Sequence, residues 1–280
     1  MYLTGEQIET YDRNGFLVIE EHFSPDELEM LSAELPGIFA EDSDRRILEK
    51  NGCVRTVFAS HRNNEVFECY SRLERMIEPV KQILDSEVYI HQFKINAKAA
   101  LGGEQWEWHQ DFLYWHHEDC MPEPRVVTAV LFLQDVNEFN GPMMVVPGSH
   151  HDGMIDLRPE ARAIEAAIAG LETSWASTLT ADLKYKINRS ILAGLVARRG
   201  IHVITAPAGS VMFFHGNLFH ASSNNLSPWD RISVFASFNS VENGLDPNPN
   251  PRPGFLACQD FRPVEMVPDD SLVELGVFAR

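Results

Sequence analysis

From residue 88 onward the chain alternates short apolar segments with turn-forming residues, and this alternation limits the possible folds more than any other feature. The segments cover residues 88–97, 126–133, 143–146, 201–206, 210–215 and 232–241. Glycine, proline and asparagine separate them, as in Asn140-Gly141-Pro142, Pro147-Gly148-Ser149 and Pro207-Ala208-Gly209. Such a series predicts short strands in a β-sandwich or barrel.

The first 86 residues carry helix signals instead. A Ser or Thr is followed three residues later by Glu or Gln at Thr4 and Gln7, at Ser24 and Glu27, and at Ser71 and Glu74. These capping patterns predict three helix starts. Gly15 ends the first helix, and residues 16–19 follow as a strand. The second helix runs to about Pro36 or slightly beyond, and the third carries apolar residues at helical spacing up to Leu84.

These elements predict one domain over residues 1–280, mainly β with flanking α-helices. Its parts are N-terminal helices and a strand at 1–86, a β core at 87–153 and 201–245, and a helical insert at 154–200. Within the insert, helices are predicted at 159–169 and 190–199. We expect the insert to form a lid.

The charge and the cysteines exclude several classes of protein. A formal net charge of −18 repels phosphate backbones and anionic membrane surfaces, so we expect no nucleic-acid and no membrane partner. No apolar run approaches the ~20 residues that span a bilayer. The four cysteines form no C-x-x-C pair, and the N-terminus lacks a signal-peptide pattern. We therefore expect a cytoplasmic protein with reduced thiols, either a monomer or a homodimer.

Four His-x-Asp/Glu patterns raise the question of a metal site. They are His109/Asp111, His116/Glu118, His117/Asp119 and His150/Asp152. A non-haem Fe(II) oxygenase binds its metal through two imidazoles and one carboxylate and leaves the other positions open. Because residues i and i+2 of a strand point the same way, one such pattern can supply two ligands.

The surrounding sequence favours His109 and Asp111. They follow a strand and the sequence Trp106-Glu107-Trp108, whose aromatic side chains are of the kind that wall a dry site. Residues 116–119 lie in a charged stretch that we expect to be a solvated turn. His150 and Asp152 follow another turn, Pro-Gly-Ser.

The third ligand must come from a distant strand, and three histidines are available: His202, His215 and His220. His220 precedes Ala221-Ser222, and Arg231 lies 11 residues later at the start of a strand. An arginine near the metal can hold a dicarboxylate through two parallel hydrogen bonds. Taken alone, each histidine is also compatible with a structural role.

Ordered blocks along nearly the whole chain make the sequence recognisable. They are 46–50 (RILEK), 55–61 (RTVFASH), 89–98 (YIHQFKINAK), 106–111 (WEWHQD), 140–142 (NGP), 147–150 (PGSH), 220–222 (HAS) and 228–231 (PWDR). Together they resemble the phytanoyl-CoA dioxygenase superfamily. The nearest resemblance is to its small-molecule branch of ectoine hydroxylases and bacterial hydroxylases of free leucine or proline.

This resemblance implies a double-stranded β-helix core of the jelly-roll, cupin-like kind, with Fe(II), 2-oxoglutarate and O2. It implies iron ligation by His109, Asp111 and His220. It places the distal carboxylate of 2-oxoglutarate on Arg231. The residues implied on the co-substrate side are Gln92, Asn96 and Ser222.

The resemblance also implies that Trp115 faces the substrate. Phe112 and Val57 complete the expected apolar contacts. Arg125 and Lys94 are the cations we expect to contact a substrate carboxylate.

The implied activity is hydroxylation of an unactivated carbon of a small, leucine- or proline-like free amino acid, with release of succinate and CO2. The alternative is an ectoine 5-hydroxylase, or a hydroxylase of another small natural-product precursor. A halogenase on this scaffold would carry Gly or Ala in place of the carboxylate, so Asp111 argues against that class. The intact ligand set together with Arg231 argues against a binding protein without turnover.

Overall fold

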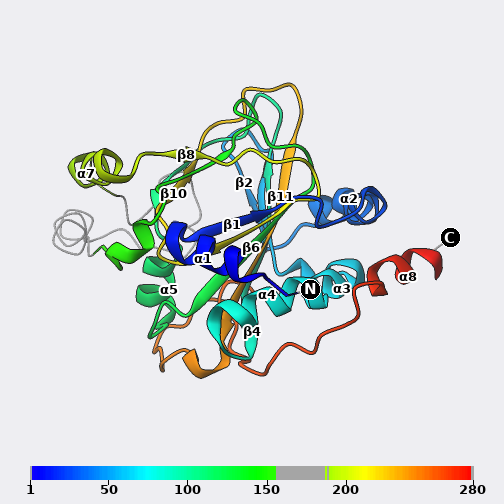
Figure 1. Ribbon diagram of the computed structural model, residues 1–280. Helices are drawn as coiled ribbons and strands as arrows, with labels where there is room; N and C mark the ends of the chain where they lie inside the picture. Colours follow the sequence, from blue (N-terminus) through cyan, green and yellow to red (C-terminus); the bar gives the residue numbers. More distant parts are fainter. Residues whose placement is uncertain (1, 156–186, 188, 279–280) are drawn as a thin grey trace.

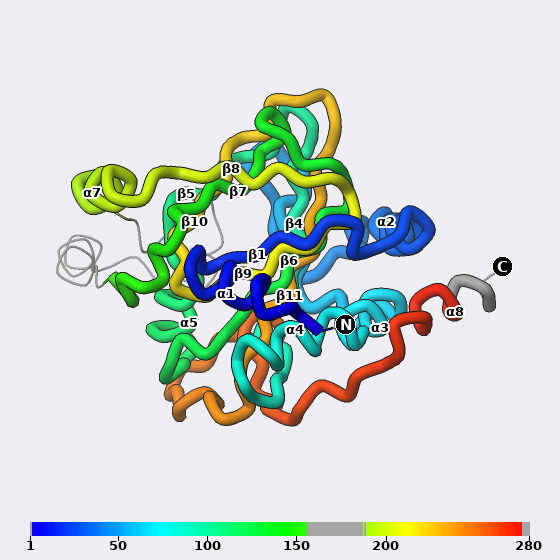
Figure 2. Tube along the Cα trace, viewed as in Figure 1, coloured from blue at the N-terminus to red at the C-terminus, as the bar shows by residue number. Residues whose placement is uncertain are grey.

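The strands form two antiparallel sheets that face each other (Figures 1 and 2). The computed structural model describes residues 2–155, 187 and 189–278. The larger sheet contains, in spatial order, β1 (Phe16–Ile19), β9 (Val211–His215), β6 (Val126–Phe132), β11 (Arg231–Ser240), β4 (Val88–Lys98), β3 (Val54–Phe58) and β2 (Arg46–Leu48). The smaller sheet contains β5 (Trp106–His109), β10 (His220–Ser222), β7 (Met143–Val145) and β8 (His202–Val203).

Helices flank this core. They are α1 (Gly5–Asn14), α2 (Pro25–Ala40), α3 (Glu65–Arg72), α4 (Glu74–Leu84), α5 (Asp111–Asp119), α7 (Arg189–Arg199) and α8 (Ser271–Phe278). Buried residues of α2, α3 and α4, such as Leu31, Phe67 and Met76, join the apolar face of the larger sheet in one core cluster. The helices therefore cover the outer face of that sheet, and its inner face is left for the site.

Alternation along β4 separates the core from the interior between the sheets. Phe93 and Ile95 point to the helix-covered core. Lys94, Asn96 and Lys98, one residue out of step, line a pocket on the other face together with residues of the smaller sheet. The pleat thus places three polar side chains side by side inside a β-rich fold.

The architecture confirms the predicted fold class: a mainly β, double-stranded β-helix with flanking helices. The predicted segments form strands β4, β6, β7, β8, β9 and β11, although β8 covers only His202–Val203 of the expected 201–206. Thr4 and Ser24 form capping boxes, and Gly15 ends α1 in the left-handed region at φ 78°. All four cysteines are free. Within the described ranges, no helix has the length and apolarity needed to cross a bilayer.

Two local predictions are wrong. Ser71 does not cap a helix, because it lies inside α3 and its hydroxyl donates to the Glu68 carbonyl. Residues 116–119 are not a solvated turn, because they belong to α5 and Asp119 is buried. Of the two helices predicted in the insert, the one at 190–199 is α7, and the one at 159–169 lies outside the described residues.

Candidate metal centre

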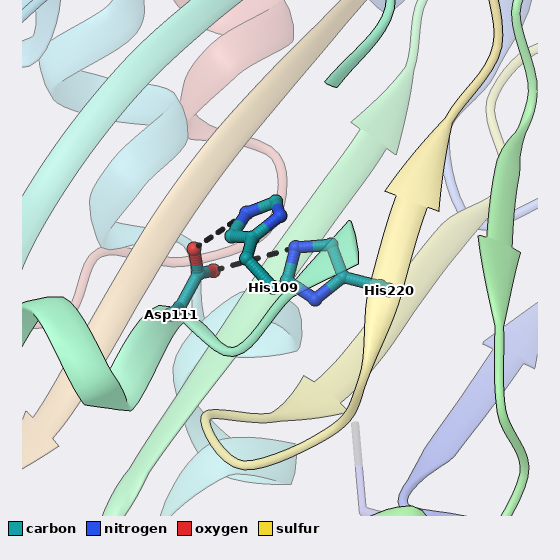
Figure 3. A group of neighbouring side chains, drawn as sticks. All are labelled: His109, Asp111 and His220. Atoms are coloured by element: carbon teal, nitrogen blue, oxygen red, sulfur yellow. Dashed lines mark ion pairs between the residues drawn. The ribbon is translucent and has the colours of Figure 1, made fainter. Parts of the chain in front are cut away.

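Three ligands come together from two neighbouring strands and one helix start (Figure 3). His109 is the last residue of β5, and Asp111 is the first residue of α5. His220 opens β10, where it pairs with His109 across the antiparallel ladder. The sharp change from strand to helix at Gln110 brings the Asp111 carboxylate round to the two imidazoles. We call His109, Asp111 and His220 the metal triad.

The distances in the metal triad suit one small cation. His109 Nε2 lies 3.5 Å from Asp111 Oδ1, and His220 Nε2 lies 3.9 Å from Asp111 Oδ2. One ligand atom from each residue lies within 4.8 Å of the others, and all three residues are buried. Two imidazoles and one carboxylate in this arrangement form the facial ligand set of non-haem Fe(II) oxygenases.

Hydrogen bonds fix which ring nitrogen of each histidine faces the metal position. His109 Nδ1 lies 2.6 Å from the Glu107 carbonyl oxygen, and His220 Nδ1 lies 2.9 Å from the Leu218 carbonyl oxygen. Because a carbonyl only accepts, each Nδ1 carries the proton. The lone pair of each Nε2 is thus left for a cation.

The electrostatic environment also suits a cation. Burial alone would raise the pKa of Asp111, but Lys94, His220 and His109 outweigh it and hold that pKa below its usual range. Burial, followed by the neighbouring His109, lowers the pKa of His220 to about 4. The metal triad is therefore a carboxylate with neutral imidazole at His220, which is the donor set that fits Fe(II).

A pocket adjoins the metal triad between the two sheets. Its lining residues are Lys94, Asn96, Lys98, Trp106, His109, Met143, His220, Ala221, Ser222, Arg231 and Phe235. Three of these side chains are cationic and none is a carboxylate. The pocket thus combines a metal position with an excess of positive charge.

Arg231 is the buried cation that donates several hydrogen bonds within the protein. Its guanidinium donates to Ser233 Oγ at 3.0 Å and to the carbonyls of Asn140 and Gly141. No carboxylate within the described residues pairs with it. Burial lowers the pKa of Arg231 to about 10, so the charge is retained at neutral pH but is poorly solvated.

The two lysines differ in their surroundings. Lys98 is buried and its Nζ donates to the Glu104 carbonyl at 2.6 Å. Burial, and then Arg231 and Arg55, lower the pKa of Lys98 well below its usual value. Lys94 is half-buried, and its Nζ lies 5.2 Å from the centre of the Phe235 ring. It has no hydrogen bond or ion pair to any residue that the structure describes.

A family model described as phytanoyl-CoA dioxygenase (PhyH) matches residues 11–233, which is most of the chain. The chain belongs to the phytanoyl-CoA dioxygenase family. It is a 2-oxoglutarate-dependent non-haem iron dioxygenase, and the sequence resemblance is confirmed.

Within this family the chain is similar to proteins of small-molecule metabolism. It is 36% identical over 265 residues to the L-proline trans-4-hydroxylase of Streptomyces griseoviridis, covering 94% of this chain and 95% of that protein. It is 35% identical over 282 residues to an ectoine dioxygenase of Bordetella bronchiseptica, covering 97% and 88%. Among solved structures, EctD from S. alaskensis with 2-oxoglutarate and 5-hydroxyectoine matches with a TM-score of 0.80 at 28% identity, covering 95% and 88%.

Some predicted co-substrate and substrate residues meet at the metal triad and others do not. Lys94, Asn96 and Ser222 line the same pocket as Arg231. Gln92 is buried on β4, but its amide donates to the Leu256 carbonyl at 2.8 Å and it is not among the pocket-lining residues.

The structure places four predicted substrate residues elsewhere. Val57 lies in the main core behind the larger sheet. Phe112 and Trp115, both on α5, pack with Met121 in a separate apolar cluster. Arg125 pairs with Glu242 at 2.7 Å.

The alternative histidines are also away from the metal triad. The His202 ring stacks on Phe16, with 5.7 Å between ring centres. His215 Nδ1 accepts a hydrogen bond from the Asn217 backbone at 2.9 Å.

Sequence reasoning did not assign a role to three pocket residues. Lys98 continues the period-two face of Lys94 and Asn96, so strand alternation was the signal that could have identified it. Phe235 and Met143 form apolar parts of the pocket wall, and no short pattern in the sequence distinguishes them from core residues.

Of the two tryptophans expected to wall the site, one lines the pocket, and Trp108 is not among its lining residues. Trp106 lines the pocket, and the Arg55 guanidinium carbon lies 3.7 Å from the centre of its ring. Arg55 is itself paired with buried Glu49 at 2.9 Å and donates to the Gln105 carbonyl. Arg55 therefore supports the Trp106 ring from outside the pocket.

Proposed function

We propose that this chain hydroxylates an unactivated carbon of a small free amino acid, leucine- or proline-like, using Fe(II), 2-oxoglutarate and O2. The observation that carries the proposal is the pocket beside the metal triad. Among the described residues that line it, three side chains are cationic, Arg231, Lys98 and Lys94, and none is a carboxylate. The positive charge of this lining can compensate more than one carboxylate next to a metal.

The co-substrate accounts for the first two cations. The buried Arg231 is suited to the distal carboxylate of 2-oxoglutarate, because a guanidinium binds a carboxylate through two parallel bonds. Lys98, whose pKa is lowered by burial and then by the nearby Arg231, adds a second donor. Asn96 and Ser222 supply further polar groups on the same wall. When bound, iron with 2-oxoglutarate and oxygen supplies the oxidation, and succinate and CO2 are released.

The third cation supports a substrate that is itself a carboxylate. Lys94 lines the pocket close to Asp111 and has no ion pair with a described residue, so its ammonium is available. Trp106, Met143 and Phe235 provide apolar surface for an aliphatic side chain. The similarity to an L-proline trans-4-hydroxylase supports an amino acid in this position.

Ectoine is the second candidate, because most of the similar proteins are ectoine dioxygenases. Product analysis distinguishes the two. The protein is loaded with Fe(II) and incubated with 2-oxoglutarate and, separately, with L-proline, L-leucine, L-isoleucine or ectoine. Mass spectrometry then detects the gain of one oxygen, and succinate is quantified in parallel. Asp111→Ala serves as the control without a complete metal triad.

We expect oxygen to be added to an amino acid, with one succinate for each product. Efficient hydroxylation of ectoine, with no oxygen added to any amino acid, would overturn the amino-acid proposal.

The role of Lys94 is tested by Lys94→Met and Lys94→Arg. A hydrogen bond to a charged group contributes about 1.5–3 kcal/mol. We therefore expect Lys94→Met to raise the KM for the amino acid by about 10- to 150-fold, with little change in the KM for 2-oxoglutarate. Lys94→Arg should recover part of the loss. An unchanged KM for the amino acid in Lys94→Met would refute this role.

A further inference from the structure

Gln110 lies between His109 and Asp111 in the sequence, and both polar atoms of its side chain form hydrogen bonds. It is 1% exposed. Its Nε2 donates to the carbonyls of Asn217 at 2.7 Å and Gly153 at 2.8 Å. Its Oε1 accepts from the backbone N–H of Ile155 at 3.0 Å. One buried amide thus binds two other segments of the chain.

The Asn217 bond reaches the turn that delivers the third ligand. This turn joins β9 to β10 and ends at His220, whose ring is oriented by the Leu218 carbonyl. A backbone bond from Phe112 to the Gly216 carbonyl at 3.0 Å runs beside the Gln110 bond. The segment with His109 and Asp111 is therefore tied directly to the segment with His220.

The strand ladder alone fixes this spacing poorly. β5 and β10 pair at His109 and His220, but the register shifts before the next pair, Trp106 and Ser222. A short ladder with an irregular register leaves the two strands some freedom to slide. Gln110 joins the two segments at a second point beyond the ladder, on the α5 side of the metal triad.

The remaining two bonds anchor Gln110 itself. Gly153 and Ile155 follow the 3-10 turn Ser149–Asp152, where Ser149 Oγ accepts from the Phe219 backbone at 2.9 Å. This segment therefore contacts both the Gln110 amide and the turn that carries His220. The three segments form a closed network around the metal triad.

We propose that Gln110 is a positioning residue that sets the distance and orientation between the His109–Asp111 pair and His220. This deepens the proposed function, because it rests on the same metal centre. Residues that orient metal ligands typically change metal affinity by 10- to 100-fold when they are replaced. The chemistry of the amide is specific: two donations and one acceptance are needed, which a carboxylate or a thioether of similar length does not provide.

The test uses Gln110→Met and Gln110→Glu, which keep the length of the side chain. Asn239→Leu is the matched control. Asn239, on β11, is also a buried amide at 0% exposed. It is hydrogen-bonded to Tyr89 of β4 and to Asn243, outside the metal pocket. Three quantities are measured on each full-length protein: Co(II) affinity by titration, the visible spectrum of the Co(II) form, and the thermal unfolding midpoint.

We expect both Gln110 variants to bind Co(II) about 10- to 100-fold more weakly and to show an altered Co(II) spectrum. Asn239→Leu should lose thermal stability yet keep the Co(II) affinity and spectrum of the wild type. Unchanged Co(II) affinity and spectrum in Gln110→Met would overturn the proposal. So would an equal loss of Co(II) affinity in Asn239→Leu, because the effect would then follow stability alone.

Two precautions keep the result clear. If either Gln110 variant fails to fold, Gln110→Asn keeps the amide but shortens it by one methylene, and a weakened Co(II) site with an altered spectrum is expected there too. No substrate or turnover enters these measurements. A wild-type protein that binds Co(II) but hydroxylates no amino acid would therefore contradict the proposed function and leave the role of Gln110 supported.

Discussion

Arg231→Met removes a buried charge, and we expect it to affect co-substrate binding and protein stability in different ways. The guanidinium has no carboxylate partner among the described residues, and burial lowers its pKa to about 10. That pKa lies well below the ordinary pKa of arginine. A tenfold change in the acid dissociation constant corresponds to about 1.4 kcal/mol, so the buried charge costs about 3 kcal/mol. Since the folded pKa is the lower one, this cost is present below about pH 10 and disappears once the pH exceeds the ordinary pKa of arginine.

The same substitution also removes hydrogen bonds. Arg231 donates to Ser233 and to the Asn140 and Gly141 carbonyls, and each such bond contributes about 0.5–1.5 kcal/mol net. The two effects are of similar size and opposite sign. We therefore expect the free energy of unfolding of Arg231→Met, without ligand, to stay within about 2 kcal/mol of the wild type.

Binding of 2-oxoglutarate should respond much more strongly. Leaving the carboxylate of a buried pair without its cation costs about 2–5 kcal/mol. The dissociation constant of 2-oxoglutarate should therefore rise by about 30-fold to several thousandfold.

Thermal unfolding with Co(II), with and without 2-oxoglutarate, measures both effects in one assay. A ligand at 100 times its dissociation constant stabilises the folded state by about 2.7 kcal/mol. We expect a clear rise in the wild-type midpoint and at most about a third of that rise in Arg231→Met at the same concentration. Arg125→Met is the control, because Arg125 pairs with Glu242 outside the pocket. The reasoning would be refuted by an equal rise in Arg231→Met, or by its unfolding far below the wild type.

Three further predictions concern the rest of the molecule. Alanine in place of any member of the metal triad should abolish Co(II) binding and turnover with the fold retained by circular dichroism, whereas His215→Ala should keep both. Burial, followed by neighbouring histidines, lowers the pKa of His150 and of His215 to about 4. Because these folded pKa values lie below the ordinary ~6.5, the stability they contribute is present above pH 6.5 and lost as the pH falls toward 4. The thermal midpoint should thus fall between pH 7 and pH 5, and fall less in His215→Gln. Finally, Arg55→Met should lower the free energy of unfolding in urea by about 3–5 kcal/mol, because it leaves Glu49 buried and unpaired. The double variant with Glu49→Met should be less destabilised than Arg55→Met alone.

Local chemistry explains what the sequence predicted well. Helix caps depend on contacts within four residues, so neighbouring residue types predict their positions. Examples are the capping boxes at Thr4 and Ser24 and the left-handed Gly15. The pair His109 and Asp111 was identifiable for a similar reason, since the two residues stand two positions apart at a predicted strand end, next to aromatic residues. His220 has no such local signal. Its strand has three residues, and only its pairing with β5 distinguishes it from His215.

The substrate side of the site depends on contacts between distant residues. Arg55, Lys94 and Arg125 look alike in sequence, but the partner of Arg125 lies 117 residues away at Glu242. The folded chain shows that, of these three cations, Lys94 lines the pocket and Arg55 and Arg125 do not. Trp115 was expected to face the substrate. It lies one helical turn beyond Asp111, about 6 Å along the axis of α5, and packs with Phe112 and Met121 in a separate apolar cluster.

The charge of the whole molecule and the charge of the pocket have opposite signs, and they act on different steps. The surface field of a protein at −18 repels an approaching dicarboxylate, but salt screens such a field over about 8 Å at physiological ionic strength. Salt screens the buried charges of Arg231 and Lys98 much less. Affinity is therefore set by a few groups inside the fold, whereas the surface mainly affects the rate of encounter. Added salt should then accelerate the association of 2-oxoglutarate while changing its affinity much less, which is the opposite of what a pocket on a basic surface would show.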